Sequence, residues 1–431
     1  MVKPGYRQTE IGVLPESWDT ITFENCFSIL PNNTLSRAEL NYNGGDVRNI
    51  HYGDILVKFP AVLDCSSEEL PYINKENVAK ASKGFLRDGD LIMADTAEDV
   101  IVGKSTEVIG IGDSKVVSGL HTIPCRPKDA EMFAPKWLGY FINHCTYHDQ
   151  LIPYVTGIKV SSVSKSAISS TVIAVPPKPE QEAIAEALSD IDTLIVNLEK
   201  LIAKKKAIKQ GAMQELLTGK RRLPGFDGAW INRTIKESCS RVGVGLATSV
   251  TQYYRTSGTV IFRNLNIKPN YLDDSDILYL DTDFAMSNPS KIIRTGDVLT
   301  VHTGYVGISC VVPPKYDGAL TFTTLISTTK SDVLVPEYLA YHLNSDLGHA
   351  EIENLQAGGG RNNLNVADFV QYSMVLPIDI NEQKAIVNIL IDMDREISEC
   401  ESKLEKYNHI KQGMMSELLT GRIRLIDKED A

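Results

Sequence analysis

The residues best suited to recognition chemistry are polar side chains on probable loops, at corresponding places in the two halves of the chain. Their guanidinium, amide, hydroxyl and imidazole groups are those that hydrogen-bond to the edges of DNA bases. Because such residues also form turns, each position has a purely structural alternative. The candidate DNA-contacting residues are Arg48, Asn49, Thr96, Lys159, Ser161, Arg263, Asn264, His302, Tyr305, Arg361, Asn362 and Asn363.

Short local matches between the halves define these places. One is an Arg-Asn pair, one follows a Gly-Asp turn and a strand, and one is a glycine-led turn before a long helix. By residue number, 48–49 is matched with 263–264, 95–96 with 302–305, and 156–161 with 358–363.

Signatures of bond-making chemistry are missing from the sequence. No glycine-rich stretch leads into Gly-Lys-Ser or Gly-Lys-Thr, no Asn-Pro-Pro-aromatic segment occurs, and no S-adenosylmethionine loop is visible. Glu401 and Lys403 fit a nuclease pattern only on a helix, without an aspartate from a strand. His144 and His148 share a helix face but lack a second ligand pair, which favours a polar surface over a metal site. We therefore predict no catalytic residue and no metal.

The chain contains a long internal repeat. Residues 180–223 align without a gap to residues 382–425, with half of the positions identical, including IKQGxMxELLTG in both copies. A repeat of this length predicts two related halves, each a variable globular domain followed by a similar long helix.

Both repeated helices carry an apolar seam in which residues alternate between steps of four and three. A seam sustained for nearly three heptads predicts a coiled-coil pair, whereas packing of each helix on its own domain is the alternative. A two-fold relation between the copies predicts an antiparallel pair of helices, over 180–217 and 382–419, on the order of 50 Å long. The predicted interface residues are Ile184, Leu188, Ile191, Ile195, Leu198, Ile202, Ile386, Leu390, Met393, Ile397, Cys400 and Leu404.

These patterns predict an α+β protein in which two α/β recognition domains are separated by two long helices. Expected elements include short strands at 90–94 and 298–301 and a helix at 135–143. The expected segments are domain 1 at 1–175, spacer 1 at 176–222, domain 2 at 223–376, spacer 2 at 377–425 and a tail at 426–431.

Composition is that of an ordinary soluble protein, with 43% hydrophobic and 23% charged residues. No apolar run approaches the length of a membrane span, and the first residues lack a signal-peptide core. Seven scattered cysteines without a CxxC pair indicate reduced thiols. We expect a cytoplasmic location.

The motifs resemble those of the specificity subunits of type I restriction-modification enzymes. The resemblance rests on the opening YRQTEIGVLPESW, on the helix starts PEQEAI and NEQKAI, and on the two IKQGxMxELLTG endings. It implies a non-catalytic subunit in which each domain reads one half of a bipartite duplex DNA target. The helices would set the gap and dock two modification subunits. S-adenosylmethionine, ATP and Mg would belong to the modification and restriction subunits, with no cofactor on this chain.

The charge of the chain limits how tightly it can bind DNA alone. The formal net charge is −11, and residues 1–175 hold 16 Lys and Arg against 21 Asp and Glu. Since duplex affinity comes largely from cations that replace counterions, we expect weak DNA binding without partners. Two alternatives remain open: a coiled-coil adaptor that ignores DNA, and a fused methyltransferase or nuclease with an unrecognised active site.

Overall fold

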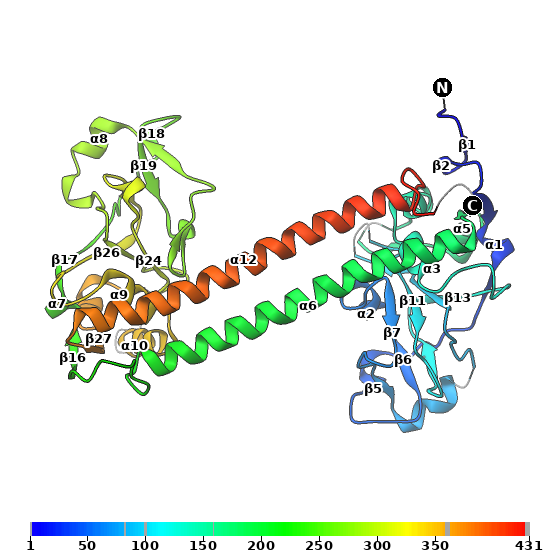
Figure 1. Cartoon of the computed structure of the whole chain (residues 1–431), viewed down its shortest axis with the longest axis horizontal. Helices are drawn as coiled ribbons and strands as arrows, with labels where there is room; N and C mark the ends of the chain where they lie inside the picture. Colours follow the sequence, from blue (N-terminus) through cyan, green and yellow to red (C-terminus); the bar gives the residue numbers. More distant parts are fainter. Residues whose placement is uncertain (1, 82, 99–100, 158, 358–362, 427–431) are drawn as a thin grey trace. The chain divides into compact units, whose positions relative to one another are not determined.

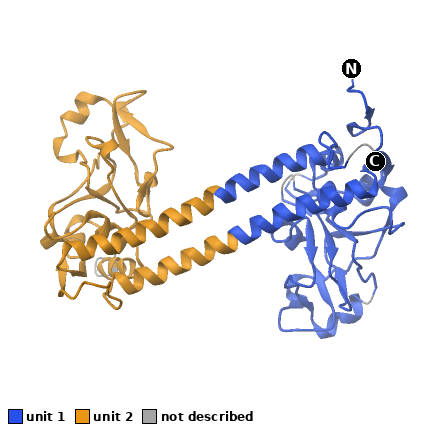
Figure 2. Ribbon diagram, in the orientation of Figure 1, with its two compact units in different colours: residues 1–198, 403–431 blue, residues 199–402 orange. Residues whose placement is uncertain are grey.

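The computed structural model describes residues 2–81, 83–98, 101–157, 159–357 and 363–426. It divides into two compact units, one made of residues 1–198 and 403–431 and the other of residues 199–402 (Figure 2). Each long helix, α6 (Lys178–Leu216) or α12 (Ile380–Leu418), contributes to both units. Unit 1 is therefore made of two segments that are far apart in the sequence. Residues 1–175, within unit 1, are called the first head, and residues 224–376, within unit 2, are called the second head.

The first head contains two main sheets, within the described residues, in the orders β4-β13-β9-β11-β7 and β12-β6-β8-β5. Pairing is mainly antiparallel, with β11–β7 and β12–β6 parallel. Its elements are β1 (Tyr6–Thr9), β2 (Gly12–Pro15), β3 (Asp19–Thr22), α1 (Phe23–Cys26), β4 (Phe27–Ile29), β5 (Leu40–Asn41), β6 (Arg48–Ile50), α2 (Tyr52–Val57), β7 (Val62–Asp64), β8 (Tyr72–Ile73), β9 (Leu91–Ala94), β10 (Thr96–Ala97), β11 (Ser105–Ile109), β12 (Val116–Ser118), β13 (Thr122–Pro127), α3 (Trp137–Ile142), α4 (Cys145–His148), β14 (Ser161–Ser162), α5 (Lys165–Ser169) and β15 (Val172–Val175).

The second head repeats this plan, with sheets in the orders β17-β26-β23-β24 and β18-β22-β19-β25 among its described residues (Figure 1). Its one parallel pair between named strands is β19–β25. Its elements are β16 (Trp230–Thr234), α7 (Ile235–Ser238), β17 (Cys239–Val244), β18 (Tyr254–Arg255), β19 (Thr259–Phe262), β20 (Ile267–Lys268), β21 (Tyr271–Leu272), β22 (Leu278–Leu280), α8 (Thr282–Met286), β23 (Val298–Val301), β24 (Ser309–Val311), β25 (Leu320–Thr321), β26 (Thr324–Thr329), α9 (Pro336–Leu343), α10 (Asp346–Ala357), α11 (Val366–Phe369) and β27 (Ser373–Pro377).

The predicted fold class is confirmed, and the expected strands correspond to β9 and β23. Both are fully buried strands of four residues, which explains their mainly apolar sequences; the one polar residue, Thr300, hydrogen-bonds to Ser309. The Gly-Asp turn before each strand also has a structural role. Asp90 and Asp297 are buried, accept a backbone hydrogen bond from the residue three positions earlier, and pair with Arg126 and Arg241 respectively.

Within each unit the long helices run antiparallel. In unit 1 the start of α6 lies beside the end of α12, since Lys411 forms an ion pair with Asp192. In unit 2 the end of α6 lies beside the start of α12, since Met213 and Leu216 share a core with Ile386 and Leu390.

Most predicted seam residues are buried, but their neighbours include more than the partner helix. Ile184 and Leu188 lie in the first head's core together with Leu418 at the end of α12. Ile386 and Leu390 lie in the second head's core with the end of α6. Each end of the helical pair is therefore built into a head, and the first seam positions combine the two packing modes considered from the sequence.

Candidate nucleic-acid interface

In the first head, the fold brings together polar residues that are far apart in the sequence. The short strands β10 and β14 pair so that Thr96 faces Ser162. His121 precedes β13, and its Nδ1 lies 3.4 Å from Thr96 Oγ1 and 3.3 Å from Asp95 Oδ1. The Tyr52 ring packs edge-on against the His121 ring, with centroids 5.2 Å apart. We call Tyr52, Asp95, Thr96, His121 and Ser162 the first polar cluster.

The second head builds a cluster at the corresponding place. Thr303 forms a β-bridge with Asn363, and the backbone of His302 accepts a hydrogen bond from Leu364 N at 2.9 Å. Asn264 Nδ2 donates to the carbonyl of Thr303 at 3.3 Å, and Asn264 Oδ1 accepts from Thr324 Oγ1 at 3.1 Å. We call Asn264, His302, Thr303, Thr323 and Asn363 the second polar cluster.

Strand register establishes which residues correspond. Ile50 pairs in parallel with Ser118, and Phe262 pairs in parallel with Thr321. The hydrogen bond that follows each pair is also the same. Gly119 N donates to the carbonyl of Ile50 in the first head, and Phe322 N donates to the carbonyl of Phe262 in the second.

The match of 48–49 with 263–264, made from sequence letters, is therefore wrong by three residues. Register equates His51-Tyr52 with Arg263-Asn264, because both pairs directly follow the matched strand ends at Ile50 and Phe262. A three-letter similarity was too short to detect the shift.

Both clusters contain a non-glycine residue with left-handed backbone. His121 has φ 53° and Thr323 has φ 48°. Each directly precedes the strand that pairs with the buried central strand, since Thr122 faces Ala94 and Thr324 faces Val301. Neither residue was among the sequence candidates, nor was Tyr52, because nothing in their spacing marks them.

The predicted DNA-contacting residues fall into different environments. Thr96, Asn264, His302 and Asn363 lie in the clusters, and Ser161 lies beside Ser162 on β14. Lys159 and Tyr305 are exposed. Arg361 and Asn362 lie outside the described residues. By contrast, Arg263 pairs with Asp276, and Asn49 is fully buried and accepts a hydrogen bond from Asn33. Asn49 is unavailable to a base and leaves the candidate set.

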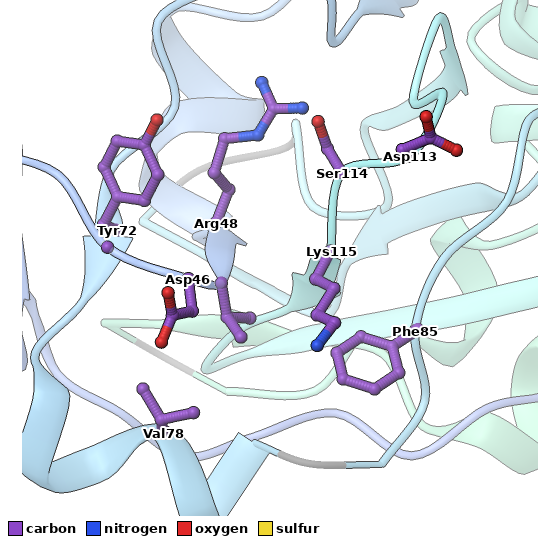
Figure 3. A pocket seen from close by; sticks show the side chains of 10 residues that line it. Asp46, Arg48, Tyr72, Val78, Phe85, Asp113, Ser114 and Lys115 are labelled. Carbon is purple, nitrogen blue, oxygen red and sulfur yellow. The ribbon is translucent and has the colours of Figure 1, made fainter.

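Arg48 lies in a separate pocket of the first head, of about 690 Å³, whose lining includes Tyr72, Phe85 and Lys115. Figure 3 shows the side chains of Arg48, on β6, and Lys115, directly before β12, extending in opposite directions. Arg48 Nη1 donates to the carbonyl of Cys65 at 2.6 Å. Its guanidinium is thus partly occupied, away from the first polar cluster.

The electrostatics of the clusters differ between the heads. The first contains the Asp95 carboxylate beside His121, whereas the second has His302 at the position of Asp95. Burial lowers the pKa of His302, which favours its neutral form. Hydrogen bonding in the clusters, and not concentrated positive charge, is what these sites offer.

The histidines weighed for metal binding have other partners. His144 accepts a hydrogen bond from Thr146 N at the start of α4, and His148 Nε2 bonds to the carbonyl of Val102 at 2.8 Å. Among the described residues no group of three His, Cys, Asp or Glu side chains is placed to hold a metal ion. In the same part of the chain, no helix is long and apolar enough to cross a membrane.

Comparisons with known proteins agree with this architecture. Residues 41–210 match the family model of the type I restriction modification DNA specificity domain. A putative type I restriction enzyme MjaX specificity subunit from Methanocaldococcus jannaschii is 22% identical over 97% of both chains. The type I restriction enzyme EcoKI specificity subunit from Escherichia coli K12 is 20% identical over 96% of this chain and 90% of that one.

Solved structures share the fold. The S subunit of a type I restriction-modification system from M. genitalium superposes with a TM-score of 0.58 at 11% identity, covering 93% of this chain and 96% of the other. A chain from a structure concerned with complex assembly and conformational transition of the type I R-M system gives a TM-score of 0.57 at 16% identity, covering 95% and 99%.

Proposed function

Because the chain belongs to the specificity subunits of type I restriction-modification enzymes, we propose that its two heads read the two halves of a split DNA target. The chain is non-catalytic, and it directs chemistry performed by other subunits of the complex. Each head would contact one half-site through its polar cluster, and the paired helices would determine the gap between them.

One observation carries this proposal: the same backbone frame presents different side chains in the two heads. Tyr52, Asp95 and His121 of the first polar cluster correspond by register to Asn264, His302 and Thr323 of the second. Thr96 and Thr303 are alike at the adjoining position. A common frame with exchanged hydrogen-bonding groups is what reading two different short sequences requires, since each base pair offers its own donor and acceptor pattern.

The helical spacer supports the division of labour. Each long helix has 39 residues, or about 58 Å at 1.5 Å per residue. Half-sites one duplex turn apart are roughly 34–36 Å from centre to centre. A pair of helices this long is sufficient to hold two heads over separate half-sites.

The net charge of −11 supports a role for partner subunits. Arg126, Arg241 and Arg263 are engaged with carboxylates of their own heads. Phosphate contacts, which supply most of the affinity of proteins for DNA, would then come largely from two modification subunits docked on the helices. S-adenosylmethionine, ATP and Mg would be bound by the modification and restriction subunits.

Methylation mapping tests the proposal directly. The chain is produced with its modification subunit, and methylated positions are mapped on genomic DNA. We expect a motif of two specified parts separated by an unspecified gap. A complex that methylates without sequence preference, or with one uninterrupted motif, would contradict the proposal.

Exchange of one head tests the division of labour. Residues 20–170 are replaced with the corresponding segment of another specificity subunit, and the reciprocal exchange is made in the second head. Each exchange should alter one part of the motif and leave the other unchanged. If either exchange alters both parts, the heads do not read independently.

A further inference from the structure

The backbone of the two clusters contains an unusual conformation at matched positions. The non-glycine residues with positive φ in the described chain are His121, Lys136, Asn270 and Thr323. Two of these four occupy the same place in the two heads. For a β-branched residue such as Thr323, left-handed backbone is strongly disfavoured, and glycine would relieve the strain. Strained residues of this kind persist only where the surrounding structure enforces them, and they cluster at functional sites.

The His121 side chain is held in place at one end only. Its Nδ1 faces Asp95 Oδ1 and Thr96 Oγ1, and its ring packs against Tyr52. Its Nε2 has no hydrogen-bond partner among the described residues, and the side chain is 47% exposed. A ring fixed at Nδ1 with Nε2 unused is prepared to make one directed hydrogen bond to an external group.

The charge around His121 favours a base edge over a phosphate as that group. The Asp95 carboxylate, adjacent to His121, would repel a phosphate oxygen. A carboxylate accepts readily from the amino group of cytosine, and hydroxyls such as those of Thr96 and Ser162 bond to either kind of base edge. Thr323 offers a hydroxyl at the matching position of the second head.

We infer that His121 and Thr323 are the specificity-determining residues of their heads, each hydrogen-bonding to a base edge in its half-site. This inference rests on the proposed function. Each residue directly precedes the strand β13 or β26 that pairs with the central strand of its head. His121 contacts Thr96 of the first polar cluster, and Thr323 adjoins Thr324, whose hydroxyl donates to Asn264 of the second.

The test replaces each residue with glycine, which removes the side chain and suits the backbone, so that folding is retained. H121G and T323G complexes with the modification subunit are assayed on duplexes carrying each of the four base pairs at every specified position. H121G should lower discrimination at one base pair of the first half-site by roughly 5- to 150-fold and leave the second half-site unchanged. T323G should do the reverse.

Two further variants sharpen the test. K136G makes the same backbone change at Lys136, which has φ 74° and lies outside the cluster, and should leave both half-sites unchanged. H121N keeps a residue that tolerates left-handed backbone and should shift preference toward adenine, because Asn pairs with adenine N6 and N7.

The outcomes distinguish failure of the proposed function from failure of the base contacts inferred for His121 and Thr323. If the wild-type complex methylates no split motif, the proposed function fails. If it does, and H121G and T323G keep the full discrimination or lower the rate equally on every duplex, only this inference is overturned, because a base contact acts on one base pair.

Discussion

The guanidinium of Arg222 donates two hydrogen bonds to the buried carboxylate of Glu382, at 2.7 Å from Nε and 2.9 Å from Nη2. In unit 1, Arg424 likewise donates two hydrogen bonds to the carboxylate of Glu180, and Trp18 Nε1 donates a third at 2.8 Å. Each pair joins the segment after one long helix to the first turn of the other. In each unit, therefore, the repeated ending of one long helix contacts the repeated start of the other.

Loss of either arginine should destabilise its unit. R222A leaves the Glu382 carboxylate buried without its cation, which costs about 3–5 kcal/mol in such pairs. We expect a clear fall in the urea midpoint of the purified chain. R422A removes an exposed cation paired with exposed Glu417, and should cost no more than about 1 kcal/mol. Equal urea midpoints for R222A and R422A would show that the buried ion pair stabilises the fold no more than the exposed one.

Buried His342 should make stability depend on pH. Burial lowers its pKa from 6.5 to about 4. Below pH 6.5 the unfolded chain binds a proton that the folded chain binds only near pH 4, so this contribution is present above pH 6.5 and is lost as pH falls to 4. H342F, with the residue found at Phe141 in the first head, should lack this loss in denaturant titrations.

The His342 experiment requires comparison of variant and wild type at each pH. Burial raises the pKa of Glu107 from 4.5 to about 7, so that stability from this group rises as pH falls from 7 to 4.5 and opposes the histidine. Y372F removes the hydrogen bond to His342 Nδ1 but keeps the ring buried. It should keep the wild-type pH slope. A slope lost in Y372F would assign the effect to the bond instead of burial.

An exposed apolar face of α6 provides a test of docking by modification subunits. Leu201 and Ile208 are seven residues apart on one face, and are 41% and 53% exposed. L201D/I208D should fold normally but lose co-purification with the modification subunit. A203D, on another face of α6 and also exposed, serves as the control. Retained assembly of L201D/I208D would place the docking surface elsewhere. Leu188 and Leu390 are unsuitable for this test because both are fully buried in head cores.

Helix length should determine the gap between half-sites. Four residues inserted after Leu198 and after Ser402 lengthen both helices by about 6 Å, the rise of about two base pairs. The tolerated gap should widen by one or two base pairs in methylation mapping. Replacing the exposed residues Glu199, Lys200, Glu405 and Lys406 with alanine keeps the length and should keep the gap. An unaltered gap after insertion would mean that the helices do not act as the spacer.

Part of this architecture was predictable because it depends on local periodicity. The apolar seam predicted two long helices, and the structure extends each by two residues at its start, at Lys178 and Ile380. Each long helix is followed by the glycine of an LLTG motif, a residue that favours a left-handed helix cap, and Gly219 and Gly421 have φ 69° and 66°. These features follow from the chemistry of neighbouring residues, which the sequence displays directly.

The candidate site was only partly predictable because it depends on pairing between distant strands. Thr96 was selected from its loop, yet its neighbour His121 precedes a strand and shows no local signal. Asn49 looked like a recognition residue and is buried. Whether a polar side chain faces solvent or a neighbouring amide depends on strand register, because a shift of one residue moves every side chain to the opposite face of the sheet.

By itself, the sequence determined that this protein has two related halves, two long amphipathic helices and the motifs of a specificity subunit, because repetition and periodicity survive in one dimension. Only the tertiary structure decided that Tyr52 corresponds to Asn264, that His121 and Thr323 share a strained backbone position, and that each arginine after one helix binds the glutamate at the start of the other. The physical reason is that hydrogen bonds and packing act over a few ångströms in space, between residues that the chain separates by tens to hundreds of positions.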